Sequence, residues 1–351
     1  MNLPQPLTHV WTYNERDDAF WKEHLEDFVP ASIIDGHLHV FRTQDRIHEM
    51  TDAMRRQYWV GELVEPCDAV NTARCQAITF PGRTVRNVAF GFPDLDFAID
   101  PANEYLRREC VARGWWCNCV TVPQWTTKEL EARIAHPGII GLKPYYTLIQ
   151  RTPDSRDTFI EASIYDFLPR HHLEVAQRHK LWITLHVPKA GRLGHPDNIR
   201  EIKEIRSDFP DIKLVIAHYG RCYTLAHAEE SLPQLAGDDG LFFDSSAVVN
   251  PDVHTYALKT LGTSRIIYGT DNPIFYMRGR RAFAGRSYRN HTNHPFYFNK
   301  VREAPEIEAN YTLFMYEELL ALKQACQTLK LSQSAVQALF HDNCLNLINR
   351  K

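Results

Sequence analysis

The sequence predicts an α/β protein built as a (β/α)₈ barrel. Short apolar segments typical of buried strands recur eight times, and amphipathic, charged segments separate them. Eight strand-then-helix units within about 250 residues match the size of such a barrel. The alternative is an open, doubly wound sheet, which often carries a glycine-rich phosphate turn. The 351-residue sequence contains no Gly-x-Gly-x-x-Gly pattern and no phosphate-loop motif, which favours the barrel.

The first predicted element is a helix over residues 14–28, because Asn14 can cap it and acidic residues fill its first turn. The eight predicted strands follow at residues 32–41, 87–93, 115–123, 139–146, 181–187, 212–219, 241–248 and 265–271. Helices are predicted at residues 126–136, 160–179, 197–208, 251–260, 311–328 and 332–348. Residues 42–86 form a long, irregular connection. We expect an N-terminal extension over residues 1–31 and the barrel over residues 32–351.

The composition narrows the range of partners and of cellular compartments. A net charge of −3 gives no basic surface for nucleic acid, so we expect no nucleic-acid partner. The eight cysteines are scattered along the chain, which is typical of reduced thiols in a reducing compartment. The N-terminus lacks the pattern of a signal peptide, and no apolar run is long enough to cross a membrane. We therefore expect a cytoplasmic protein without a membrane partner.

Polar residues end five of the predicted strands. Residues two apart on a strand share a face, so His37 and His39 should lie side by side, and Asp35 should share their face. In a (β/α)₈ barrel the catalytic groups lie at the C-terminal ends of strands. The same rule selects Lys143, His186, His218 and Asp271. Each should share a strand face with two earlier residues: Ile139 and Gly141 for Lys143, Trp182 and Thr184 for His186, Leu214 and Ile216 for His218, and Ile267 and Gly269 for Asp271. Packing alone does not account for this set, and two neighbouring imidazoles can form half of a divalent metal site.

These motifs resemble those of the amidohydrolase superfamily of metal-dependent hydrolases. The resemblance is closer to the amidohydrolase-related branch, which includes lactone hydrolases and aromatic or muconate-type decarboxylases. It covers roughly residues 32–348, and the order and strand placement of the motifs make it specific. The matching stretches are Asp35-Gly36-His37-Leu38-His39, Leu185-His186, Ala217-His218-Tyr219-Gly220, Tyr268-Gly269-Thr270-Asp271-Asn272-Pro273 and Asn343-Cys344-Leu345-Asn346-Leu347.

The resemblance implies a barrel that carries one divalent ion, with zinc expected first and manganese as the alternative. The implied ligands are His37, His39, His186 and Asp271, with His218 just outside them or on a second metal. Three imidazoles and a carboxylate suit Zn²⁺ and leave a position for water, whose pKa the metal would lower towards about 7. Asp271 could then act as the general base, and His218 could bind the attacked carbonyl oxygen or protonate the leaving group.

Lys143 is open to three interpretations. In some branches of the superfamily the lysine that ends the fourth strand is carbamylated and bridges two metals. In the branch that this chain resembles most closely, one metal is usual. Lys143 would then bind a substrate carboxylate or form a buried ion pair, and a second metal on a carbamylated Lys143 is the less favoured interpretation.

A basic, aromatic segment, residues 275–300, is predicted to form a long loop after the last strand and indicates a small anionic organic substrate. It contains five arginines and a lysine but no acidic residue, and guanidinium groups pair well with carboxylates. The segment could instead be an exposed loop, or could pair with an acidic patch on a sister subunit. One or two rim arginines are better anchors than the whole set. The expected substrate-binding residues are Lys143, Tyr145, Arg42, Arg221 and Arg278.

The leading functional hypothesis is a metal-dependent hydrolase that attacks a lactone, ester or amide bond (C–O or C–N) in a small carboxylated compound through a metal-bound hydroxide. The alternative is a decarboxylase on the same site, with an aromatic or unsaturated carboxylic acid as its substrate. A third hypothesis is a barrel that binds a ligand without chemistry. The connection after the first strand and the region 275–310 could also form the surfaces of a homodimer.

Overall fold

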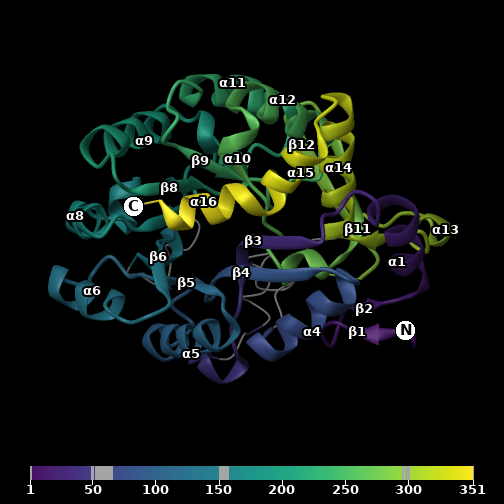
Figure 1. Ribbon diagram of the computed structural model, residues 1–351, viewed down its shortest axis with the longest axis horizontal. Helices are drawn as coiled ribbons and strands as arrows, with labels where there is room; N and C mark the ends of the chain where they lie inside the picture. The colour runs from purple at the N-terminus through teal and green to yellow at the C-terminus, as the bar shows by residue number, and fades with distance from the viewer. Residues whose placement is uncertain are drawn as a thin grey trace.

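The computed structural model describes residues 2–48, 51, 66–149, 158–294, 296 and 301–350. Within them, eight parallel strands form one sheet in which each strand pairs with the next along the chain (Figure 1). The (β/α)₈ barrel predicted from the sequence is therefore confirmed. The strands are β3 (Ser32–His39), β4 (Thr84–Phe90), β5 (Trp116–Val120), β6 (Ile139–Lys143), β7 (Trp182–Leu185), β8 (Lys213–Ile216), β9 (Phe242–Asp244) and β10 (Ile266–Ile267).

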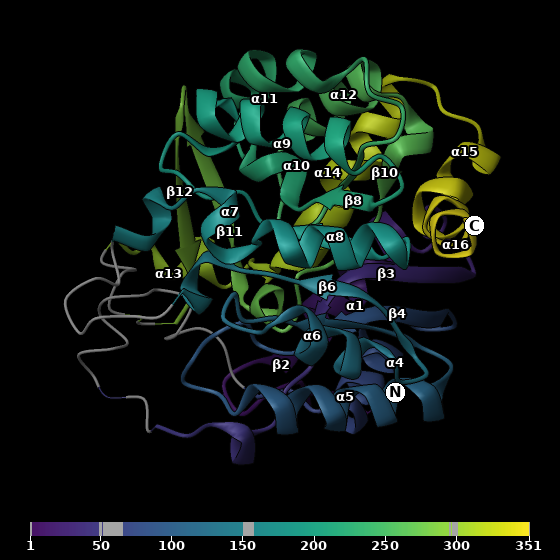
Figure 2. The ribbon, with the colours of Figure 1, turned by 90° about the vertical axis from the view of Figure 1, so that its left-hand side faces the viewer.

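Helices surround the barrel, with α4, α5 and α6 on one side and α9, α11 and α12 on the other (Figures 1 and 2). The helices are α1 (Glu15–Phe20), α4 (Ala69–Thr79), α5 (Ile99–Arg113), α6 (Thr127–Ile134), α7 (Ile164–Phe167), α8 (Arg170–Arg178), α9 (Pro196–Asp208), α10 (His218–Arg221), α11 (Leu225–Ser231), α12 (Pro251–Leu261), α13 (Pro305–Glu308), α14 (Phe314–Thr328), α15 (Gln333–Gln337) and α16 (Asn343–Asn349). Helices α4 and α5 are absent from the sequence prediction. In α4 the apolar residues are not confined to one face, which weakens the helical pattern.

The barrel closes where β3 meets the chain that leaves β10. The Gly36 amide donates to the Tyr268 carbonyl oxygen (2.9 Å), and the Asp271 amide donates to the His37 carbonyl oxygen (2.8 Å). The buried Asp35 carboxylate adds a side-chain bridge, since it accepts hydrogen bonds from the Thr270 amide (3.0 Å) and hydroxyl (2.6 Å). Burial raises the pKa of Asp35 to about 7. We call these contacts the seam, and they hold the His37 end of β3 beside Asp271.

Asp35 does not share the face of His37 and His39, contrary to the sequence prediction. The register between β3 and β4 shifts between Asp35 and Leu38, and this irregularity interrupts the alternation of faces. Ile34 packs inside the barrel, so Asp35 points the other way and binds Thr270, whereas His37 and His39 line the cavity.

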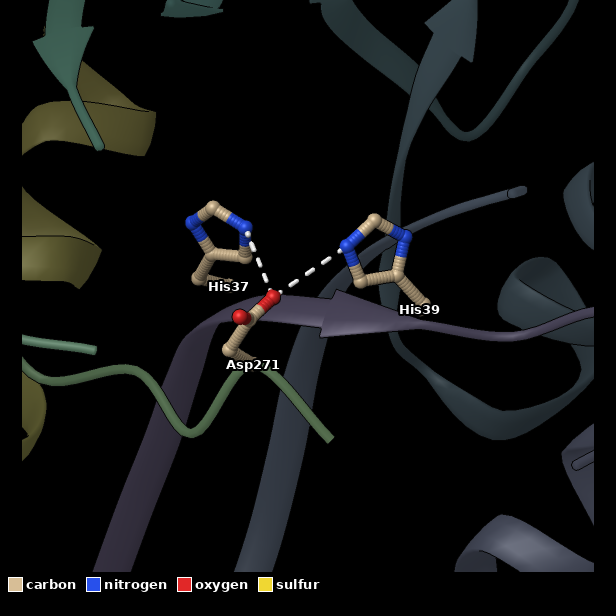
Figure 3. A group of neighbouring side chains, drawn as sticks. All are labelled: His37, His39 and Asp271. Carbon is tan, nitrogen blue, oxygen red and sulfur yellow. Dashed lines mark ion pairs between the residues drawn. The ribbon is translucent and has the colours of Figure 1, made fainter. Parts of the chain in front are cut away.

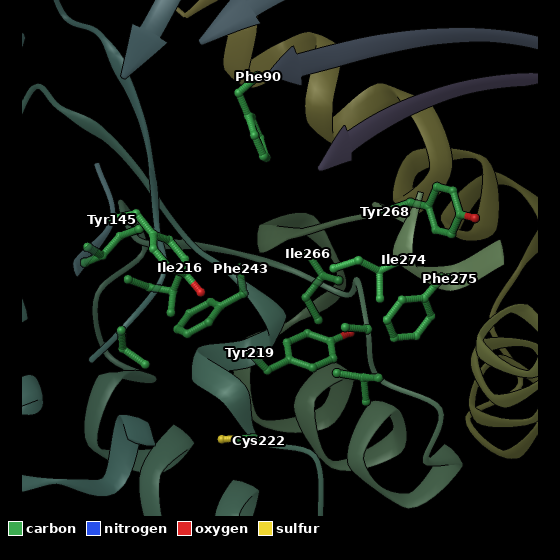
Figure 4. Packing of buried hydrophobic residues seen from close by; sticks show 14 of the residues in the cluster. Phe90, Tyr145, Ile216, Tyr219, Cys222, Phe243, Ile266, Tyr268, Ile274 and Phe275 are labelled. Carbon is green, nitrogen blue, oxygen red and sulfur yellow. The ribbon is translucent and has the colours of Figure 1, made fainter. Parts of the chain in front are cut away.

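The inner face of β8 is also different from the prediction. Val215 packs with Ile34 and Trp182 of other strands, which places it inside the barrel. Ile216 therefore faces outwards, where Figure 4 shows it in one apolar layer with Phe243 and Tyr219. His218 would follow Ile216 outwards on a regular strand. The backbone instead becomes left-handed at His218 (φ 56°), and the imidazole turns into the cavity.

The C-terminal helix closes the N-terminal end of the barrel. Cys344 and Leu347 of α16 pack against inward residues of five strands, so this end is filled with apolar side chains. Those inward residues are Ile34, Val88, Trp182, Val215 and Ile267. Access to the barrel interior is thereby left to the opposite end, where the strands finish.

The segment after the last barrel strand is a hairpin and not the long loop that the sequence predicts. β11 (Arg278–Ala284) pairs antiparallel with β12 (Ser287–Thr292), and β13 (Thr312–Leu313) adds to β11. Gly285 (φ 57°) occupies the left-handed position of the tight turn between the two strands. Residues 295 and 297–300 of the predicted basic segment lie outside the described residues.

Arg278 begins this hairpin and joins the N-terminal helix to it. Its guanidinium forms an ion pair with the fully buried carboxylate of Asp17 and donates to the carbonyl oxygens of Thr12 (2.8 Å) and Tyr311 (2.8 Å). The expected role of Arg278 in substrate binding is therefore not supported, since its donors serve the fold.

Among the described helices, none is long and apolar enough to span a membrane.

Replacing Arg278 with alanine (Arg278→Ala) should lower the free energy of unfolding by about 3–5 kcal/mol, because the buried Asp17 carboxylate would lose its partner. Urea denaturation would measure the change. Arg170→Ala is the matched control, since Arg170 pairs with Asp208 on the exposed surface and its loss should alter stability little. Wild-type stability in Arg278→Ala, combined with weaker substrate binding, would contradict this account.

Candidate metal centre

Two imidazoles and one carboxylate converge where the barrel closes (Figure 3). His37 and His39 come from the end of β3, and Asp271 comes from the chain after β10. The Oδ1 atom of Asp271 lies 3.4 Å from His37 Nε2 and 3.3 Å from His39 Nε2. Each residue offers one ligand atom, and the three atoms lie within 4.8 Å of one another. This spacing allows one ion to contact all three.

The hydrogen bonds of the two imidazoles fit a cation between them. His37 Nδ1 faces the Asp244 carboxylate (2.8 Å), and His39 Nδ1 faces the Gly91 carbonyl oxygen (3.3 Å). Both partners accept hydrogen bonds, so each Nδ1 carries the proton and each Nε2 presents a lone pair to Asp271. Burial lowers the pKa of both imidazoles and favours their neutral forms. Lone pairs that face a carboxylate oxygen repel it unless a cation lies between them, and a divalent ion meets this need.

His186 lines the same cavity, and one of its ring nitrogens is free to bind a ligand. Its ring is buried, and burial lowers its pKa, as do the nearby charges of Arg221 and other cationic groups. Its Nδ1 atom is buried and has no hydrogen-bond partner among the described residues. An unpaired buried nitrogen is costly unless a ligand or water molecule satisfies it. The ring centroid of His186 lies 5.3 Å from that of His218, so the two imidazoles are neighbours.

Asp244, at the end of β9, positions two of these imidazoles. Besides the contact with His37, its carboxylate accepts hydrogen bonds from the His218 amide (2.9 Å) and the Ser246 hydroxyl (2.5 Å). Ser246 in turn faces His218 Nδ1 through its carbonyl oxygen (3.0 Å) and hydroxyl (2.9 Å). His37, His218 and Asp244 also lie within metal-binding distance of one another. Because both oxygens of Asp244 already accept hydrogen bonds, we interpret this group as a brace for the imidazoles and not as a second metal site.

Backbone strain gathers at the same place. Four consecutive residues after β8 have positive φ: His218 (56°), Tyr219 (48°), Gly220 (70°) and Arg221 (65°). Asp271 also has a positive φ (57°). Each non-glycine residue in this region costs about 1–3 kcal/mol and persists where the surroundings hold it. The strain turns His218 and Asp271 towards the cavity.

The cavity at these strand ends measures about 860 Å³, including its opening to solvent. It brings together the metal-ligand candidates His37, His39, His186 and Asp271 with His218, Lys143, Tyr145 and Arg221. Lys143 is buried, and its Nζ lies 4.3 Å from the ring centroid of Phe90. Burial lowers the pKa of Lys143 to about 8, although the charges of Asp271 and Asp244 act against this shift. No carboxylate pairs with Lys143 among the described residues, so the buried ion pair considered for it is not seen.

Arg42 lies outside this cavity, contrary to its expected role at the rim. Its guanidinium forms a bidentate ion pair with Asp45 (2.8 Å and 2.6 Å) and stacks on the Tyr105 ring at 3.9 Å. Both contacts come from nearby barrel-flanking segments. Arg42 therefore supports the connection after β3 and does not line the cavity.

Sequence reasoning missed Asp244 and Arg281. Asp244 ends β9, but the predicted strand ran on to residue 248, so the strand-end rule that selected Asp271 did not select Asp244. Arg281, on β11, lines the cavity in place of Arg278. The sequence showed a run of arginines there but carried no signal for which of them faces inwards.

The sequence matches the amidohydrolase family (Amidohydro_2) over residues 34–349, most of the chain. The chain belongs to the amidohydrolase family. It is therefore an enzyme of the amidohydrolase type, as the sequence resemblance predicted. The family is metal-dependent, and the cluster of His37, His39 and Asp271 agrees with this. No curated protein sequence matches the chain.

Solved structures of amidohydrolase type share the fold. One is a probable 2-pyrone-4,6-dicarboxylic acid hydrolase from Acinetobacter baumannii with bound citric acid (16% identity, TM-score 0.53, covering 90% of this chain and 98% of that one). A second is a dihydroxybenzoic acid decarboxylase from Polaromonas sp. JS666 with manganese and the inhibitor 2-nitroresorcinol (13%, 0.53, 92% and 98%). A third is an amidohydrolase from Burkholderia multivorans with bound zinc (15%, 0.51, 91% and 99%). At these identities the similarity shows the fold alone.

The variant Asp244→Asn should weaken metal binding by about 10–100-fold, because the imidazole of His37 would lose the carboxylate that orients it and raises its basicity. Competition against a chromogenic chelator at pH 7 would measure the affinity. Asp238→Asn is the matched control, since Asp238 forms an ion pair with Arg206 (2.8 Å) and does not line the cavity. Equal metal affinity in Asp244→Asn and in the wild type would show that Asp244 has no orienting role.

Proposed function

We propose that the protein is a mononuclear metal-dependent hydrolase that cleaves a lactone, ester or amide bond in a small carboxylated substrate. The observation that carries this proposal is the convergence of His37, His39 and Asp271 on one point of a cavity that also holds Lys143 and Arg221. Ligands for an ion and cations for a carboxylate thus share one small space. The internal hydrogen bonds of Asp244 support a single ion, and they leave the bridging role of a carbamylated Lys143 with less support.

His37, His39, His186 and Asp271 would hold the ion. When bound, the ion supplies Lewis acidity, which activates water and polarises a carbonyl group at neutral pH. Zinc is the proposed ion, because imidazole and carboxylate ligands suit it, and manganese is the alternative. Of the Asp271 carboxylate, Oδ1 faces the two imidazoles and Oδ2 forms no hydrogen bond with a described residue. Asp271 would accept the proton of the attacking water through Oδ2 and pass it on towards the leaving group.

His218 and Lys143 would act on the substrate itself. Because the Ser246 carbonyl oxygen can only accept, His218 Nδ1 carries the proton, and Nε2 is the nitrogen left for the substrate. This Nε2 lone pair would accept the proton that Asp271 takes from the attacking water and deliver it to the leaving group. The ammonium of Lys143 would bind the substrate carboxylate, with Tyr145 beside it.

A decarboxylase is the second candidate, because the same cations and ion could hold a carboxylate and a neighbouring hydroxyl during loss of CO₂. The Polaromonas protein of similar fold is a decarboxylase, which adds support to this candidate. The two reactions differ in one measurable respect: hydrolysis takes an oxygen atom from water, and decarboxylation does not.

Turnover in ¹⁸O-water distinguishes the two reactions. Protein reloaded with zinc or manganese would be offered carboxylated lactones, aryl esters and hydroxybenzoates, and mass spectrometry would record products and CO₂. We expect near-stoichiometric metal and one solvent oxygen in the product per turnover. Release of CO₂ without solvent oxygen would replace the hydrolase by the decarboxylase. Only traces of bound metal after reloading would count against both.

The variant Asp271→Asn should lower kcat by about 10²–10⁴-fold, because the amide cannot accept the proton. The comparison must be made at saturating metal, since the same change weakens a proposed ligand. Asp238→Asn again serves as the control and should keep wild-type kcat. Full activity of Asp271→Asn with bound metal would remove Asp271 from the reaction.

A further inference from the structure

Two guanidinium groups lie over the same two tyrosine rings on one part of the cavity wall, and a third arginine, Arg221, lines the cavity with them. The Cζ atom of Arg281 lies 5.1 Å from the ring centroid of Tyr223 and 4.5 Å from that of Tyr288. On the same two rings, the Cζ of Arg192 lies at 5.3 Å and 5.4 Å. Arg221, Arg281, Tyr223 and Tyr288 line the cavity directly. We call Arg192, Arg221, Arg281, Tyr223 and Tyr288 the arginine–tyrosine cluster.

The cluster has no ion-pair partner within the described part of the chain. Among the described residues, Arg192, Arg221 and Arg281 form no ion pair, and their hydrogen bonds go to neutral groups. Arg281 donates from Nε to Asn290 Oδ1 (2.8 Å) and from Nη1 to the Ala247 carbonyl oxygen (2.9 Å). Its Nη2 atom has no partner among them, so two N–H groups remain to bind a ligand. Arg221 likewise uses only Nη1, which donates to the carbonyl oxygens of Val187 (3.4 Å) and Lys189 (2.8 Å).

Other arginines of the same hairpin are neutralised, which sets Arg281 apart. Arg278 pairs with Asp17, Arg280 with Glu303, and Arg286 with Glu230 (2.6 Å). Partial enclosure also lowers the pKa of the Arg281 and Arg192 guanidinium groups. Keeping such charges together and away from water costs free energy. An anion that enters the cavity would recover that cost.

The cluster is separate from the cation proposed to bind the first carboxylate. Lys143 ends β6, whereas Arg281 donates to Ala247, just beyond β9, and β7 and β8 lie between these strands in the sheet. Tyr223 links the cluster to the reacting centre, since its ring centroid lies 6.3 Å from that of His218. The cavity thus offers positive charge at two places on its wall, with His218 next to one of them.

Charge balance points to a dianion. Lys143, Arg221 and Arg281 line the cavity, and the carboxylates that line it are Asp94 and Asp271. Asp244 lies behind His37 and also acts on Lys143, so these charges balance until a divalent ion is bound, and the ion then leaves positive charge in excess. A monoanionic substrate would leave part of this excess uncompensated.

We propose that Arg281, assisted by Arg221 and the rings of Tyr223 and Tyr288, binds a second anionic group, so that the enzyme selects small dicarboxylates over the matching monocarboxylates. This specificity rests on the proposed function, because it concerns the substrate of the same cavity. Arg281 is carried by the β11–β12 hairpin and not by a barrel strand. It would set substrate choice without taking part in bond cleavage.

Equilibrium binding of two unreactive probes tests the proposal without requiring turnover. Isophthalate carries two carboxylates on a benzene ring, and benzoate carries one. Calorimetry on the zinc-loaded protein should show isophthalate binding about 10–100-fold more tightly than benzoate, as expected for one added charge-assisted contact. In Arg281→Gln, isophthalate affinity should fall to that of benzoate, and benzoate affinity should stay unchanged. Arg281→Lys should recover part of the preference, because it restores the charge but not the bidentate geometry.

Arg286→Gln is the matched control, since Arg286 lies on the same hairpin turn and pairs with Glu230 on the surface. It should keep the wild-type preference, and circular dichroism should show all variants folded. Equal affinity of the wild type for both probes, or an equal loss of both in Arg281→Gln, would overturn the proposal. A dicarboxylate preference in a protein without hydrolase or decarboxylase turnover would support the cluster while rejecting the proposed function.

Discussion

The site depends on one constraint, which is the closure of the barrel at the seam between β3 and the chain after β10. The Asp271 amide donates to the His37 carbonyl oxygen at 2.8 Å, and the His39 amide donates to the Asn272 carbonyl oxygen at 2.9 Å. The backbone hydrogen bonds that complete the sheet are thus the same ones that set two imidazoles against a carboxylate. A barrel that failed to close would lose the metal-ligand group together with the fold.

Around the seam, buried polar groups fix directions that the strands alone leave open. Asp35 holds Thr270 and so anchors the chain that leads to Asp271. Asp244 receives the imidazole of His37 and the amide of His218. In an interior of low dielectric constant, such hydrogen bonds are strong and unpaired groups are costly, so each orientation is well determined. Rigid placement of this kind is what a metal site and a proton acceptor require.

The sequence predicted the members of the site better than the way the fold positions them. His37, His39, His186 and Asp271 were found because apolar strands with a polar last residue are visible in the chain. His218 was also found and lines the cavity as expected, but Ile216 does not share its face, since a left-handed turn brings the ring inwards. The prediction for the arginines failed for a different reason. Arg278 and Arg281 look alike in the sequence, yet one pairs with Asp17 and the other reaches Ala247 and the cavity.

By itself, the sequence determined the eight-strand pattern, the strand-end imidazoles and carboxylate, and membership of the amidohydrolase family. These features are local, because the periodicity of a strand and the residue that ends it depend on a few consecutive residues. The tertiary structure decided which charges are neutralised, which imidazole nitrogens carry protons and where excess positive charge remains. The partners that decide these points are distant in the chain, as Asp244 is from His37, and only folding brings them together.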